Sequence, residues 1–177
     1  MIKIVTLTVN DITTDMLYDF WHYQPITKKW TYCINKWEVT DTSVLREWSK
    51  EKREWISEYF CEQLDRGGSV VAAYDADRLV GFCSLDGYLR GKTEKYANLT
   101  MLFVDDRWKR KGVGRKLFFE ICKHAERMKA DKLFISAIPA VETIAFYFNM
   151  GCGDAMEIIP EYVDTEHDRY LEYLLGK

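Results

Sequence analysis

The chain has few prolines, no paired cysteines and no long apolar stretch, and each absence excludes a class of protein. Three prolines and 47% hydrophobic residues exclude a disordered or linker-built chain. No run of about 18 apolar residues occurs, which excludes an ordinary transmembrane helix, and the first residues lack a signal-peptide pattern. The five cysteines include no Cys-x-x-Cys pair and the three histidines lack metal-ligand spacing, so neither a metal site nor a disulfide framework is expected.

Length and charge narrow the class further. A chain of 177 residues is long enough to bury one core, so we expect a single domain over residues 1–177. Scattered free cysteines are typical of a reducing compartment, which predicts a cytoplasmic protein. The net charge of −3 argues against a nucleic-acid-binding protein, because such proteins neutralise phosphates with excess basic residues. Neither a nucleic acid nor a membrane is expected as a partner.

Hydrophobic periodicity predicts an α/β fold. Strands are expected over 2–9, 69–74, 79–85, 96–104 and 132–138, and near 154–159 and 168–175. Helices are expected from Thr13 or Thr14 to about Tyr23, over 41–66, from 112 to about 128, and over 141–150, whereas 24–40 shows no clear period. This order predicts a mixed sheet with helices on both sides.

Two glycines open the helix that follows the strand over 96–104. Gly112 and Gly114 come after the end of the strand, and six basic residues lie in the ten positions from Arg107 to Lys116. The first turn of a helix has unpaired N–H groups and the positive end of the helix dipole. Glycine lets the backbone approach a phosphate without an intervening Cβ. The segment therefore predicts a site for a phosphate-bearing polyanion.

Other interpretations of this segment differ in how well they fit. A P-loop requires an upstream glycine and a following Lys-Ser/Thr, which Gly112 lacks, and a dinucleotide fingerprint requires a third glycine, where Leu117 stands. Both are excluded. A solvated basic helix start, with glycines that serve only the turn, and a nucleic-acid patch over 107–116 stay open as alternatives.

Two motifs resemble those of the GNAT superfamily of N-acetyltransferases. The segment Lys109-Arg110-Lys111-Gly112-Val113-Gly114 resembles its acyl-CoA-binding motif, Gln/Arg-x-x-Gly-x-Gly/Ala, after a strand and before an amphipathic helix. About thirty residues further on, 142–152 resembles its second motif, with Phe-Tyr followed by a glycine. The resemblance covers roughly 69–152. It implies a mixed, mostly antiparallel sheet of six to seven strands flanked by about four helices.

The resemblance also implies acetyl-CoA as cosubstrate and assigns its contacts. The N–H groups of Arg110, Lys111, Gly112, Val113, Gly114 and Arg115 would hold the pyrophosphate, and the backbone of Leu102, Phe103 and Val104 would pair with the pantetheine arm. Lys109 stands where the motif prefers Gln or Arg, and it keeps the charge but not the planar fork. Ala140 replaces an asparagine that contacts pantetheine in many members.

Tyr147 matches the family tyrosine that protonates the departing thiolate. A phenol has an ordinary pKa near 10, so it keeps its proton at neutral pH and can donate it. The alternative is that Phe146, Tyr147 and Phe148 only pack the helix. Many relatives place a glutamate that acts as the general base near the position of Asn98, and an asparagine cannot take that role. Glu142, Glu94, Asp86 or a water chain are the candidates for the general base.

The acceptor is expected to be a primary amine on a small molecule or peptide. Aromatic residues over 16–37 form either a wall for a cationic amine or a hydrophobic anchor. Seven acidic residues over 154–177 would either favour a cationic acceptor or form a solvated edge. The same fold could instead serve as a non-catalytic acyl-CoA or phosphate-ligand module. A homodimer is possible, as in many relatives.

Overall fold

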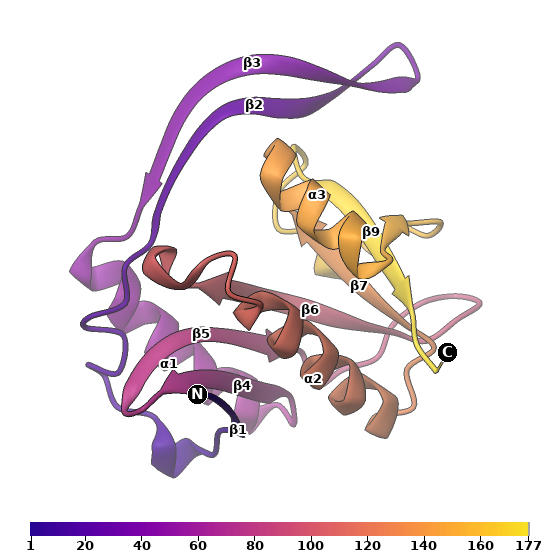
Figure 1. Cartoon of the computed structure of the whole chain (residues 1–177). Helices are drawn as coiled ribbons and strands as arrows, with labels where there is room; N and C mark the ends of the chain where they lie inside the picture. The colour runs from indigo at the N-terminus through magenta and orange to yellow at the C-terminus, as the bar shows by residue number, and fades with distance from the viewer. Residues whose placement is uncertain (177) are drawn as a thin grey trace.

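A seven-stranded sheet forms the centre of the computed structural model, which describes residues 1–176 (Figure 1). Its strand order is β1-β4-β5-β6-β7-β9-β8, and all neighbours are antiparallel except β6 and β7. The strands are β1 (Ile2–Thr6), β4 (Ser69–Asp75), β5 (Arg78–Leu85), β6 (Tyr96–Val104), β7 (Lys132–Ala137), β8 (Gly153–Asp154) and β9 (Arg169–Leu174). The mixed, mostly antiparallel sheet is therefore confirmed.

Helices pack on both faces of this sheet, and the described part of the chain contains three of them, not about four as expected. Alternate residues of β4 point to opposite faces, so Val71 joins the core beneath α2 (Val113–Arg127) and Val70 joins the core beneath α1 (Lys50–Asp65). α3 (Val141–Met150) follows β7 and ends at Gly151, whose φ of 98° suits a glycine.

Strands β6 and β7 separate partway along their length. Their parallel pairing covers three residue pairs and ends at Asn98 opposite Phe134. Immediately beyond, the register between β5 and β6 shifts at Thr100, which is the extra residue of a β-bulge. A bulge bends and twists its strand. The rest of β6, from Leu99 to Val104, therefore diverges from β7 and leaves a gap in the sheet that side chains and loops surround.

A long hairpin arches over this gap (Figure 1). It consists of β2 (Tyr23–Cys33) and β3 (Lys36–Glu47), joined at Ile34 and Asn35, which both have positive φ as this tight turn requires. The N–H of Trp30 donates to the carbonyl of Pro139 at 2.7 Å, just before α3. The hairpin thus connects the α1 side of the molecule to the α3 side.

Three sequence predictions are wrong in this region and near the C-terminus. The helix expected from Thr13 or Thr14 to about Tyr23 is replaced by turns over 14–19, which bury both Leu17 and Phe20, and Tyr23 begins β2. The helix expected over 41–66 begins only at Lys50. Val44 and Trp48 fit either structure, since residues four apart share a face in a strand as well as in a helix. The strand near 154–159 is reduced to Gly153–Asp154.

The other predicted elements are confirmed with boundaries close to those expected. Within residues 1–176, no helix combines the length and the apolar character that crossing a membrane requires.

Candidate active site

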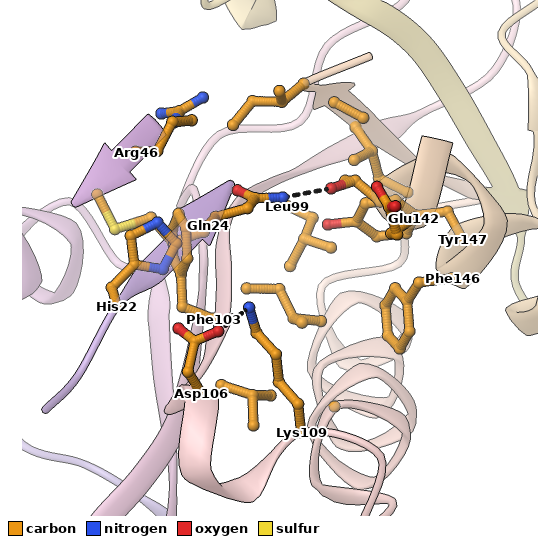
Figure 2. A pocket seen from close by; sticks show the side chains of 18 of the residues that line it. His22, Gln24, Arg46, Leu99, Phe103, Asp106, Lys109, Glu142, Phe146 and Tyr147 are labelled. Carbon is orange, nitrogen blue, oxygen red and sulfur yellow. Dashed lines mark hydrogen bonds and ion pairs between the residues drawn. The ribbon is translucent and has the colours of Figure 1, made fainter. Parts of the chain in front are cut away.

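A cleft of about 930 Å³ occupies the gap between β6 and β7. β6 contributes Leu99–Val104 and β7 contributes Ile135–Ala137, while α1, the hairpin, the glycine turn, α3 and the loop before β9 supply the remaining walls. Figure 2 shows His22, Gln24 and Arg46 on the hairpin side and Glu142, Phe146 and Tyr147 on the α3 side. The amide of Gln24 donates to the Thr143 hydroxyl at 3.2 Å, so the hairpin is tied to α3 across the cleft.

The glycine turn forms the end of the cleft nearest α2. Gly112 precedes α2 with a φ of 78°, and Arg110 also has a positive φ, 60°, where an L-residue is strained. A Cβ on Gly114 would lie 3.2 Å from Cε2 of Phe146. The turn therefore keeps its backbone open at the start of α2, where the first N–H groups have no helical acceptor.

Most of the predicted cofactor contacts line this cleft. They are Leu102, Phe103, Val104, Lys109, Arg110, Gly112, Val113, Gly114 and Arg115. The ammonium of Lys109 pairs with Asp106 at 2.5 Å, which turns part of its charge away from a ligand. Lys111 is outside the lining, and its ammonium lies 4.3 Å from the centre of the Trp108 ring. The role of its backbone N–H stays a prediction.

Tyr147 lies in the wall of the cleft on α3. The residue is 7% exposed, and burial raises the pKa of its phenol well above the ordinary value. The group therefore keeps its proton at neutral pH, as a proton donor must. Burial likewise raises the pKa of Cys152 to about 12, so this thiol is protonated and behaves as a small core residue.

The three carboxylates considered as general bases lie in different places. Glu142 lines the cleft in the first turn of α3. Glu94 pairs with Lys132 at 2.5 Å and is outside the cleft lining. Asp86 is also outside the lining, and it accepts from the N–H of Tyr88 at 3.3 Å. Only Glu142 of these three faces the cleft.

The aromatic wall of the cleft comes from other residues than those expected. Among the aromatics over 16–37, only Tyr23 lines it. Phe20 is in the core. The wall is formed instead by Trp48, which follows the hairpin, and by Trp55 and Tyr59, which lie on α1. The helical spacing of Trp55 and Tyr59 was visible in the sequence, but their exposure to a cleft was not.

His22 is a further cleft residue that the sequence did not single out. It is 3% exposed, and neither of its ring nitrogens has a hydrogen-bond partner among residues 1–176. Its ring centre lies 4.3 Å from that of Trp48 and 5.3 Å from that of Phe103. Burial lowers the pKa of His22 to about 4, so the imidazole is neutral at physiological pH.

Comparison with known proteins connects this architecture to a family. Residues 29–152 match the profile of the acetyltransferase (GNAT) family. None of the curated protein sequences is significantly similar to the chain.

Several solved structures share the fold at low sequence identity. Nourseothricin acetyltransferase superimposes with a TM-score of 0.72 at 13% identity, over 99% of each chain. A protein described as a streptothricin acetyltransferase, from Bacillus anthracis and in complex with acetyl coenzyme A, gives 0.67 at 17%, over 99% of this chain and 100% of that one. The PaiA N-acetyltransferase of Thermoplasma acidophilum, in complex with coenzyme A, gives 0.61 at 16%, over 98% and 99%. The profile match spans more than half of the chain, and the protein therefore belongs to the acetyltransferase (GNAT) family.

Proposed function

We propose that this protein transfers the acetyl group of acetyl-CoA to a primary amine by direct attack of the amine on the thioester. One observation carries the proposal. An open glycine turn at the start of α2 directly follows a strand that has separated from its neighbour, and a protonated Tyr147 faces the same cleft. Two relatives with this fold hold acetyl-CoA or CoA, which supports the choice of cosubstrate.

The cofactor would bind largely through the backbone. The N–H groups at the start of α2 would hold the pyrophosphate, helped by the charges of Arg110 and Arg115. Beyond Asn98, the edge of β6 has no strand partner on the β7 side, so the backbone of Leu102–Val104 is free to pair with the pantetheine amides. An N–H on this strand would also polarise the thioester carbonyl, as oxyanion donors do.

Tyr147 would complete the transfer. When the C–S bond breaks, the thiolate needs a proton, and the buried phenol supplies it. The amine's carbon–nitrogen bond forms as the sulfur leaves, so no acyl-enzyme intermediate is required. Cys83 and Cys152 are buried thiols, and the mechanism does not use them.

The test combines binding and turnover. Titration calorimetry of acetyl-CoA at moderate salt should show one-to-one, micromolar binding. Release of the CoA thiol with an amine panel (spermidine, kanamycin, streptothricin and a lysine-containing peptide) should then show turnover. Binding without turnover for every amine would favour a non-catalytic acyl-CoA module, and absence of binding would contradict the proposal.

A further inference from the structure

The C-terminal acidic residues do not form a continuous rim. Five of the seven have contacts elsewhere: Asp154 with Arg169, Glu157 with the N–H of Lys92, Glu161 with Arg90, Glu166 with His167, and Glu172 with Lys132. The remaining two, Asp164 and Asp168, line the cleft. The fold therefore selects two carboxylates out of seven and places both of them at the candidate active site.

Asp168 has a structural role at this position. Its carboxylate accepts from the Ser136 hydroxyl at 2.8 Å and from the Thr165 hydroxyl at 3.0 Å, and the residue is buried. Ser136 belongs to β7, two residues beyond the last pairing with β6. The charge of Asp168 reaches Arg46 on β3, where it partly offsets the lowering of the Arg46 pKa by burial. Asp168 is thus already satisfied by protein groups.

Asp164 differs from Asp168 in having no partner. Its N–H donates to the hydroxyl of Ser136 at 3.1 Å, which fixes the loop against β7. Within residues 1–176 its carboxylate forms no ion pair and accepts no hydrogen bond, and it is open to the cleft. Asp164 is accessible to solvent at the mouth of the cleft, yet partial burial by the surrounding walls raises the pKa of its carboxyl to about 6, and the charge of Asp168 adds to this effect.

Two other residues of the cleft, Tyr59 and His22, support a polar ligand near Asp164. Tyr59 on α1 lies close enough that the charge of Asp164, after burial, helps to raise the pKa of its phenol. His22 lines the same cleft with two unpartnered, buried ring nitrogens, and Figure 2 shows its ring directed inward. Buried polar atoms in native proteins normally have partners. A ligand with polar hydrogens would supply one for His22.

We propose that Asp164 is the general base of the reaction, and that it receives the ammonium group of the acceptor and takes its proton. This inference rests on the function proposed above. An ammonium group beside Asp164 would offset the repulsion between Asp164 and Asp168. The N–H of Asp164 is bonded to Ser136 on β7, across the gap from the part of β6 to which the proposed function assigns the thioester.

The proton balance of the reaction is complete with this assignment. Asp164 accepts one proton from the ammonium, and the neutral amine attacks the thioester carbon. The carbon–nitrogen bond forms and the C–S bond breaks, while Tyr147 gives its proton to the departing sulfur. The second proton of the attacking nitrogen returns to the Tyr147 oxygen. The products are the acetamide and the CoA thiol, and Asp164 loses its proton to solvent.

Glu142 is the competing candidate. It also lines the cleft, but it lies in the first turn of α3 and not in the loop that is bonded to Ser136. The environment of Asp164 favours its protonated form, because the walls of the cleft and the like charge of Asp168 both act on it. A carboxylate that is ionised at neutral pH, yet has a raised proton affinity, is suited to general base catalysis.

The experiment compares Asp164→Asn with Glu142→Gln and with Glu58→Gln, a matched charge change at an exposed position of α1 outside the cleft. For the best amine of the panel, Asp164→Asn should lower kcat/KM about 100-fold at neutral pH and leave acetyl-CoA affinity within about twofold. Glu58→Gln should match the wild type. Wild-type kcat/KM should fall about tenfold per pH unit below pH 6, and this limb should be absent in Asp164→Asn.

High pH provides a readout that a structural role would not change. The deficit of Asp164→Asn should shrink as the pH approaches the pKa of the amine, because the free amine then needs no base. The assignment would be overturned if Asp164→Asn kept a kcat/KM within about threefold of wild type. It would also be overturned if the low-pH limb were absent in Glu142→Gln and present in Asp164→Asn.

A separate binding measurement distinguishes this inference from the proposed function. Spermidine is titrated into the complex with CoA, which cannot turn over. Wild type should bind spermidine at least about tenfold more tightly than Asp164→Asn does. Equal affinities would refute the role of Asp164 even if no amine in the panel were acetylated. Conversely, if the wild type acetylated no amine of the panel but still bound spermidine more tightly than Asp164→Asn does, only the proposed function would be refuted.

Discussion

The two halves of the cleft are built in different ways. The half assigned to acetyl-CoA comes from one continuous segment, β6, the glycine turn and α2, and offers mainly backbone atoms. The half assigned to the acceptor combines the hairpin, α1 and the loop before β9, which are far apart in the sequence, and offers side chains. A shared cofactor can be held by backbone geometry, whereas acceptor choice depends on side chains that only the fold brings together.

The largest expected effect concerns Tyr147, where the two halves meet. Tyr147→Phe should lower kcat by about 100- to 1,000-fold, because the departing thiolate loses its proton donor. Acetyl-CoA affinity should stay within about twofold, since the ring is retained. Tyr173→Phe, on β9 outside the cleft lining, is the control. A wild-type rate for Tyr147→Phe would show that another group protonates the sulfur.

A side chain in the glycine turn should damage the cofactor half alone. In Gly114→Val, the new Cβ would lie 3.2 Å from Phe146, and the side chain would obstruct the start of α2. Acetyl-CoA affinity should fall about 100-fold in calorimetry. Gly153→Val is the matched control, because no atom lies within 4 Å of a Cβ there. Unchanged binding in Gly114→Val would place the phosphates elsewhere.

The buried imidazole of His22 should make stability depend on pH. Because burial lowers its pKa to about 4, the native state resists protonation that the unfolded chain accepts below about 6.5. The contribution to stability is full above this value and is lost as the pH falls toward 4, by on the order of 2 kcal/mol. His22→Phe should reduce this loss in urea unfolding measured at pH 7 and at pH 4.5. An unchanged pH dependence would mean that His22 is already protonated or solvated.

The smallest expected effect concerns the attachment of the hairpin. The guanidinium of Arg169 lies 4.5 to 5.0 Å from the ring centres of Trp30, Trp37 and Phe148, and it joins the hairpin to α3 and β9. Arg169→Met should raise the acceptor KM by about tenfold and leave acetyl-CoA affinity unchanged. Arg66→Met, at an exposed position, is the control. If Arg169→Met weakened acetyl-CoA binding as much as it raised the acceptor KM, the two halves of the cleft would not be independent.

The cofactor half was largely predictable because its signals are local. A strand, a basic turn with two glycines and an amphipathic helix are all defined by neighbours in the sequence, and the resemblance of this segment to a family was visible there. Gly112 and Gly114 lie at the start of α2, Tyr147 lies on α3, and all three line the cleft, while their roles stay predictions. The strained φ of Arg110 could not be foreseen, since it follows from the closure of the turn.

The acceptor half was mostly missed, for a physical reason. The four-residue spacing of Val44 and Trp48 suits a strand and a helix alike, so the hairpin was not recognised. His22 is one of three histidines scattered along the sequence, and Asp164 is one of seven acidic residues over 154–177. Their significance comes from burial and from neighbours supplied by distant elements.

The sequence by itself determined the mixed fold, the open turn before α2 and the tyrosine on α3, because hydrophobic periodicity and glycine conformation act over a few residues. Only the tertiary structure decided which of the seven C-terminal carboxylates faces the cleft without a partner among residues 1–176, and which imidazole is buried there. Desolvation and charge repulsion depend on atoms that surround a group in space, and those atoms come from every part of the chain.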